Sequence, residues 1–192
     1  MRRTCFRTFL SMLSISALTL TSPVQAEIIK PVSVKGIGKY TNSLRLLIDG
    51  RTPLQGAAFD DPSCVYWYDP SVSFVIDLGA LYMISGITMQ VDNNDNYRLS
   101  CSRDGRRYTS VLYLGSETGE TGWGMETVST GKGHKEYIQD LRFTPAPARY
   151  IKLSASGGDL IYAASEILVS GTRAVNLMPQ QNSGGTKPAA VD

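Results

Sequence analysis

Tyr97-Arg-Leu-Ser-Cys-Ser-Arg-Asp-Gly105 is the stretch that decides the fold class. Its first five residues alternate between apolar and polar side chains, as a strand with one buried face requires. Its last two residues, Asp-Gly, tolerate positive φ and predict a tight turn. A second apolar run over residues 108–114 follows the turn, so the stretch predicts an antiparallel pair of strands.

Short runs of the same kind fill most of the chain on both sides of this pair, whereas helical periodicity is almost absent after residue 27. They are separated by Gly, Pro, Asn and Asp, and the clearest cover residues 74–78, 87–91, 151–153 and 167–169. Strands at this spacing without intervening helices predict an all-β antiparallel sandwich or jelly roll.

The two ends of the chain differ in composition from this middle part. Residues 1–26 combine early arginines, a short apolar run and a Val-Gln-Ala sequence, which is typical of a secretory signal peptide cut before Glu27. Residues 172–192 are rich in Gln, Asn, Ser, Gly, Pro and Ala, which predicts a disordered tail. We therefore expect one domain over residues 27–171, in a secreted or periplasmic protein without a transmembrane segment.

Charge changes once the signal peptide is set aside. The chain has 19 Lys and Arg against 17 Asp and Glu, and three of the arginines lie in the first 26 residues. The remainder has 16 basic and 17 acidic residues, a net charge of about −1. This balance does not suggest the positive field of a nucleic-acid-binding protein, so we expect no nucleic-acid partner.

Two cysteines, Cys64 and Cys101, lie within the expected domain, and two interpretations stay open. In an exported protein a disulfide between them is reasonable. Cys101, however, alternates with Tyr97 and Leu99 on the apolar side of its strand, which equally predicts a buried free thiol.

Seven segments in a fixed order resemble the discoidin, or coagulation factor V/VIII type C, domain and its galactose-binding-like relatives, the family 32 carbohydrate-binding modules. The resemblance covers roughly Leu44 to Gly171. The segments are Leu47-Ile-Asp-Gly50, Trp67, Phe74-Val-Ile-Asp-Leu-Gly79, Ile84-Ser-Gly-Ile87, residues 97–105, Ala148-Arg-Tyr-Ile-Lys-Leu153 and Ala164-Ser-Glu-Ile-Leu-Val-Ser-Gly171.

This resemblance implies an eight-stranded antiparallel jelly-roll sandwich whose loops at one end hold a ligand. It also implies a non-catalytic binding module whose partner is a carbohydrate of a cell surface or matrix. An extracellular protein-interaction or adhesion domain without a sugar pocket is the main alternative. A glycoside hydrolase comes last, because nothing in the sequence marks two carboxylates as a catalytic pair.

The polar loop Val91-Asp-Asn-Asn-Asp-Asn-Tyr97 first suggests a calcium loop of the EF-hand type. That interpretation fails, because Tyr97 and Arg103 stand where such a loop needs Gly and Glu. In the carbohydrate-binding relatives the corresponding loop contacts sugar hydroxyls, and a later loop supplies an aromatic platform.

The resemblance thus implies a glycan site, with Trp123 as an additional ring. Its polar and aromatic members are Asp92, Asn94, Asp95, Asp159 and Tyr162. The alternative is that the Asn and Asp residues only bond their own backbone in a turn, and that Tyr162 belongs to the core.

The resemblance also implies a structural Ca²⁺ between Asp49 and Glu166, two oxygen donors from distant segments. The sequence departs from the family pattern at Val65, where a Thr is usual. The alternative is that Asp49 caps a turn and that Glu166 forms a salt bridge or caps a backbone amide.

Overall fold

The computed structural model describes residues 26–118 and 124–174. Within them the helical segments are two short 3-10 turns, η1 (Leu44–Leu47) and η2 (Ser116–Thr118), so no described helix could cross a membrane. The strands are β1 (Glu27–Ile29), β2 (Ser33–Ile37), β3 (Val65–Trp67), β4 (Ser73–Asp92), β5 (Asn96–Ser102), β6 (Thr109–Leu114), β7 (Met125–Ser129), β8 (Ala146–Ser156) and β9 (Tyr162–Arg173).

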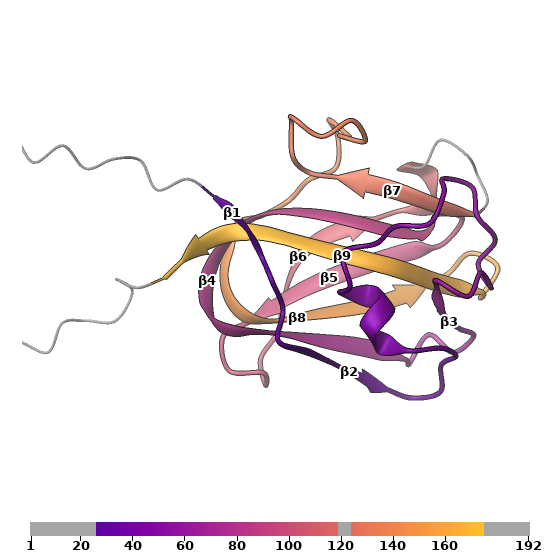
Figure 1. Cartoon of the computed structure of the whole chain (residues 1–192), viewed down its shortest axis with the longest axis horizontal. Coiled ribbons are helices and arrows are strands. Elements are labelled where there is room, and N and C mark those ends of the chain that lie inside the picture. The colour runs from indigo at the N-terminus through magenta and orange to yellow at the C-terminus, as the bar shows by residue number, and fades with distance from the viewer. Residues whose placement is uncertain (1–25, 119–123, 175–192) are drawn as a thin grey trace, which may run out of the picture.

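The long strand β4 belongs to both layers of the molecule, because it bends in its middle (Figure 1). The bend contains Gly79, whose φ of 78° suits a residue without a Cβ. Asp77, just before it, accepts the Gly79 N–H at 2.7 Å and two hydrogen bonds from Arg149, both at 3.0 Å. These contacts fix the point at which the strand passes from one layer to the other.

Every strand pairing is antiparallel. The C-terminal half of β4 lies between β7 and β9, and β9 also pairs with β1 and β3, which together form the first layer. The N-terminal half of β4 lies between β2 and β8, and β5 and β6 follow, which form the second layer. The predicted all-β antiparallel jelly-roll sandwich is confirmed, with nine strands in the described residues.

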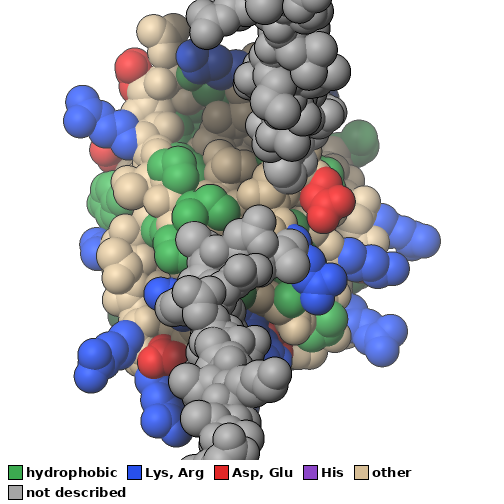
Figure 2. Space-filling model, turned by 90° about the vertical axis from the view of Figure 1, so that its left-hand side faces the viewer, with side chains coloured by type: hydrophobic (Ala, Val, Ile, Leu, Met, Phe, Trp, Pro, Cys, Tyr) green, Lys and Arg blue, Asp and Glu red, His purple; other side chains and the backbone are tan. Residues whose placement is uncertain are grey.

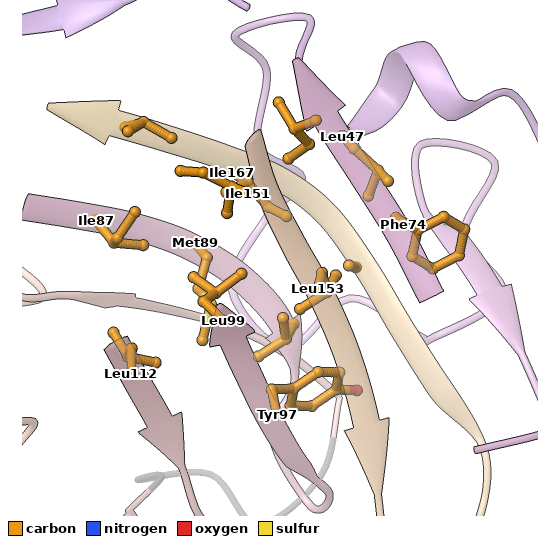
Figure 3. Close-up of a cluster of buried hydrophobic side chains, with 14 of the residues drawn as sticks. Leu47, Phe74, Ile87, Met89, Tyr97, Leu99, Leu112, Ile151, Leu153 and Ile167 are labelled. Carbon is orange, nitrogen blue, oxygen red and sulfur yellow. The ribbon is translucent and has the colours of Figure 1, made fainter. Parts of the chain in front are cut away.

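The core fills the space between the layers, and Figure 3 shows side chains from β4, β5, β6, β8, β9 and η1 converging there. Tyr97, Leu99 and Cys101 are buried, as the alternation in β5 predicts. Trp67 lies among aromatic rings, 4.8 Å from Phe74 and 5.7 Å from Tyr162 between centroids. Burying each large apolar side chain contributes about 1.5–3 kcal/mol, which makes the core between the two layers the main source of stability.

The C-terminal boundary lies slightly beyond the prediction. Thr172 and Arg173, expected in the disordered tail, belong to β9, and the Ala174 N–H donates to the carbonyl of Leu81 at 2.9 Å. Residues 175–192 of the predicted tail and residues 1–25 of the predicted signal peptide lie outside the described residues.

Both domain cysteines are free and buried, so the free-thiol interpretation holds and the disulfide does not form. Cys101 lies in the main core, whereas Cys64 packs in a separate cluster with Met125 and Ala163. Burial raises the pKa of Cys64 to about 12 and that of Cys101 to about 11, so both thiols stay protonated.

Candidate ligand-binding site

Two loops meet at the end of the sandwich that lies on the right in Figure 1. Residues 93–95 join β4 to β5, and residues 157–161 join β8 to β9. The strand register requires the meeting, because Val91 pairs with Ala164 and Asn96 pairs with Ser156. Segments about 65 residues apart in sequence therefore share one surface.

The direct contact between these loops joins two residues predicted for the site. The Asn94 side-chain amide donates to the Asp159 carboxylate at 3.1 Å, in a solvent-exposed position. Asp159 also accepts the N–H of Ile161 at 2.9 Å, which fixes the direction of its carboxylate. The pair therefore presents the exposed carboxylate of Asp159 to solvent, fixed by the half-buried Asn94 and by the backbone.

Asp95, a third predicted residue, supports this surface from beneath. It is fully buried under the loop 157–161, and neither carboxylate oxygen makes a well-formed hydrogen bond among the described residues. Burial raises its pKa to about 7, the carboxylates of Asp159 and Asp92 add to the rise, and the backbone N–H groups of Asp159 and Leu160 oppose it.

The loop can fit over Asp95 because of its backbone. Gly157 and Gly158 have φ values of 72° and 61°, and Leu160 has a φ of 68°, which is uncommon for a residue with a branched side chain. A Cβ on Gly158 would collide with the Asp95 carboxylate. The glycine pair is therefore needed for the carboxylate and the loop to approach each other.

Asp92, the fourth predicted residue, is also a support. It is 3% exposed at the end of β4, where it pairs with Met125 of β7. Its pKa is raised to about 6, mainly by burial and also by the charge of Asp159, while a hydrogen bond from the backbone of Gly124 opposes the rise. The next residue, Asn93, is fully buried and donates to Glu126 at 3.1 Å, so this side of the loop is braced against β7.

The predicted stacking role of Tyr162 needs correction. Its side chain is fully buried against Trp67, and its hydroxyl donates to the carbonyl of Gly157 at 3.2 Å. A ring with no exposed face cannot stack on a sugar, so Tyr162 holds the loop as a core residue. Trp123, the other predicted ring, lies outside the described residues.

An exposed ring that the sequence analysis missed lies at the same end. Tyr68 follows β3 directly and is 59% exposed. Because Trp67 pairs with Tyr162, Tyr68 lies beside the start of β9 and the loop 157–161. The alternation in Val65-Tyr-Trp-Tyr68 could have predicted this exposure, because a Trp67 that faces the core places its two tyrosine neighbours on the outer side of the strand.

Tyr68 continues a line of aromatic side chains along the outside of β3. Its ring lies 6.0 Å from that of Tyr66, which in turn lies 5.7 Å from Phe59, both in edge-to-face geometry. Together with Asn94, Asp159 and the half-exposed Leu160, Tyr68 forms what we call the loop-end surface.

The residues predicted to hold Ca²⁺ are close together but have other partners. Glu166 is 2% exposed and accepts the Gly50 N–H at 2.8 Å, while the exposed Asp49 accepts the N–H of Arg51 at 3.0 Å. Burial raises the pKa of Glu166 to about 7, and the neighbouring Asp49 contributes. Two adjacent carboxylates fit a cation, although the described residues contain no cluster of three or more His, Cys, Asp or Glu that could bind one.

Comparison with known proteins concerns the fold of the chain. No protein-family model and no curated protein matches the chain. Among solved structures, the lectin binding domain of Lectinolysin in complex with Lewis b matches with a TM-score of 0.56 and 14% identity, over 78% of this chain and 99% of the other. A Streptococcus pneumoniae fucose binding module matches with a TM-score of 0.52 and 16% identity, over 76% and 94%.

This chain has the galactose-binding-like fold. A truncated AlyQ with CBM32 and alginate lyase domains also matches, with a TM-score of 0.55 and 16% identity over 77% of this chain. The chain spans 34% of the length of that protein. The predicted structural resemblance to discoidin-type and family 32 modules is therefore confirmed at the level of the fold.

Proposed function

We propose that this protein is an exported, non-catalytic carbohydrate-binding module that recognises a glycan at its loop-end surface. The observation that carries the proposal is the exposed carboxylate of Asp159, held by Asn94, at the same end of the sandwich as the exposed ring of Tyr68. Sugar recognition uses amide and carboxylate groups for hydroxyls and a flat ring for the C–H face. The solved structures with this fold include modules that bind Lewis b and fucose, which supports the same class of ligand.

The charge around the surface favours a neutral sugar. Asp159 is exposed there, Asp69 follows Tyr68 directly, and the buried Asp92 and Asp95 lie behind. An anionic sugar would meet like charges at short range, which is unfavourable. We therefore expect neutral hexoses, deoxyhexoses or N-acetylated sugars rather than uronic acids.

A glycan array followed by calorimetry on the strongest neutral ligand tests the proposal. Replacing Asn94 and Asp159 with alanine, or Tyr68 with alanine, should weaken binding by about tenfold or more, equivalent to ~1.4 kcal/mol. Tyr113→Ala is the matched control, because Tyr113 is 49% exposed on a different strand, β6. Binding to no glycan, or equal losses in Tyr68→Ala and Tyr113→Ala, would overturn the proposal.

We further propose that Asp49 and Glu166 hold a structural Ca²⁺. The support is their adjacency and the burial of Glu166, whose charge is otherwise opposed by desolvation. A cation there would supply the compensating positive charge and tie the segment after η1 to β9. Melting with and without chelator, compared with the Glu166→Gln variant, tests this without relying on glycan binding.

A further inference from the structure

The outer side of the second layer is unlike the loop end. The second layer consists of β2, the N-terminal half of β4, β5, β6 and β8. These strands and the turn joining β5 to β6 contain seven basic residues and two acidic ones. The rest of the chain after residue 26 has nine basic and fifteen acidic residues. We call this surface the basic face; its basic residues are Lys35, Arg98, Arg103, Arg106, Arg107, Arg149 and Lys152.

The acidic residues of the basic face are both engaged in local structure. Asp77 pairs with Arg149 at the bend of β4. Asp104 accepts the N–H groups of Arg106 and Arg107 at 2.9 and 3.0 Å within its own turn. In the part of the chain that the structure describes, Arg98 and Lys152 form no ion pair. Their charges are therefore available to an external partner.

The strand register places these basic side chains side by side on neighbouring strands. Arg98 pairs with Tyr113 on one side and Ser154 on the other, while Lys152 lies between Val75 and Ser100. Ser100 is 6% exposed, so small hydroxyl residues form the floor beneath the long side chains. Neighbouring strands lie about 4.8 Å apart, which spaces the cations across the face rather than at one point.

Tyrosine rings hold the cations in place. Arg98 lies 5.6 Å from the ring centroid of Tyr113, and Lys152 lies 4.7 Å from that of Tyr108. Such contacts keep a side chain extended over its neighbour while leaving its charge accessible. They also reduce the ordering that binding would otherwise require.

A cavity of about 400 Å³ lies at the end of the basic face, between the β5–β6 turn and the start of β8. Arg103 and Arg107 line it, with Ser102, Thr109 and Pro147. The acidic Asp104 also lines it, and its carboxylate accepts hydrogen bonds from the Ser102 hydroxyl and the Arg107 N–H. Figure 2, which looks onto the end where β1 begins and β9 ends, shows Lys and Arg side chains standing out around the edge. An anionic group at the end of a chain that crosses the face would find basic and hydroxyl partners in this cavity.

We propose that the basic face binds a polyanionic polysaccharide, through carboxylate or sulfate groups that repeat along the glycan. Charge complementarity selects an anion, and the spread of single cations over a flat sheet suits repeated single charges. Of the large apolar side chains on these strands Ile37 and Tyr113 are about half exposed, which is too few to enter a bilayer, and the ring of Tyr113 lies against Arg98. The proposal is independent of the neutral-glycan site at the loop end.

Retention of the full-length protein in gels or on sensor surfaces carrying heparin, polygalacturonate or neutral dextran tests the inference. We expect retention by at least one polyanion, none by dextran, and a decline as salt rises. The Arg98→Gln/Lys152→Gln variant should bind about tenfold more weakly, a change of ~1.4 kcal/mol. Its matched control is Arg51→Gln/Lys132→Gln, which removes the same charge from exposed positions elsewhere.

The outcomes separate the alternatives. Retention by heparin alone identifies sulfate as the group bound, and retention by polygalacturonate alone identifies the uronate carboxylate. No retention, or equal losses in the two double variants, overturns the proposal. The proposal is also overturned if duplex DNA or anionic vesicles displace the protein from the gel more effectively than free polyanion does. The Asn94→Ala/Asp159→Ala variant should be retained like the wild type, so failure of the loop-end site would be seen separately.

Discussion

Strands β5 and β8 carry part of the basic face and adjoin the two loops of the loop-end surface, yet the charged residues of the two surfaces are arranged in opposite ways. At the loop end, Asp92 and Asp95 are turned inward and buried, whereas the carboxylate of Asp159 is exposed. On the basic face the charged side chains extend outward over a floor of small serines. A polar side chain on the outer side of a strand therefore faces a partner directly, whereas a polar side chain buried under a loop mainly holds the conformation of that loop.

The difference also explains why net charge is a poor guide to partners here. The near-neutral balance after residue 26 averages an acidic part of the chain with a basic layer. Acids concentrate where loops need short side chains that accept backbone N–H groups. Arginine and lysine concentrate where a sheet has a solvent-facing side that long side chains can cover.

The largest expected effect separates the two tyrosines at the loop end. Tyr162→Ala removes a fully buried ring and should lower the free energy of unfolding by about 3–5 kcal/mol, as for other large aromatic truncations. Tyr68→Ala should change stability by less than about 0.5 kcal/mol, because its ring is mostly exposed. Urea denaturation of both variants measures the difference, and similar losses would contradict the placement of Tyr162 in the core.

A smaller effect distinguishes the buried carboxylates of the loop end from exposed ones. The folded-state pKa of Asp95, about 7, lies above its ordinary value of 3.8. The folded state then holds a proton that the unfolded state releases, so the free energy of unfolding should fall as pH rises from about 4 to about 7. Asp92, with a pKa of about 6, acts in the same direction.

Thermal melts in chelator between pH 4 and pH 8 check this pH dependence. Asp95→Asn should make it shallower, leaving the contributions of Asp92 and Glu166, and should be more stable than the wild type at pH 8, because the buried charge at position 95 is removed. Asp60→Asn, at an exposed position, is the control and should follow the wild-type curve. A wild-type curve that rises with pH over this interval would show that Asp95 is stabilised as a carboxylate.

Much of the fold, and less of the site, could be predicted from the sequence. Alternation in β5 fixed which residues face the core, and the order of short motifs predicted the sandwich. The structure brings the two predicted loops together at one end of the sandwich. The alternation of buried and exposed side chains, however, predicts orientation only within strands, not in the loops between them. Whether Asp95 faces solvent depends on the loop 157–161 folding over it, a contact between distant segments that no local pattern encodes.

The smallest effect concerns the first layer, away from both surfaces. A Ca²⁺ held by Asp49 and Glu166 should raise the melting temperature by a few degrees at saturating calcium, because it binds only the folded state. Glu166→Gln should abolish the response to calcium and chelator. Binding of glycans at the loop end and on the basic face should change little in this variant. A melting temperature of the wild type that does not change on adding chelator would contradict the metal site.

The central claim, that the loop-end surface is the glycan site, is tested most directly by NMR. Amide chemical shifts are recorded while the strongest neutral glycan from the array is titrated into the ¹⁵N-labelled protein. We expect shifts confined to residues 68–69, 93–95 and 157–161, with residues 98, 113 and 150–152 unchanged. Shifts on the basic face instead, or no shifts at saturating glycan, would contradict it.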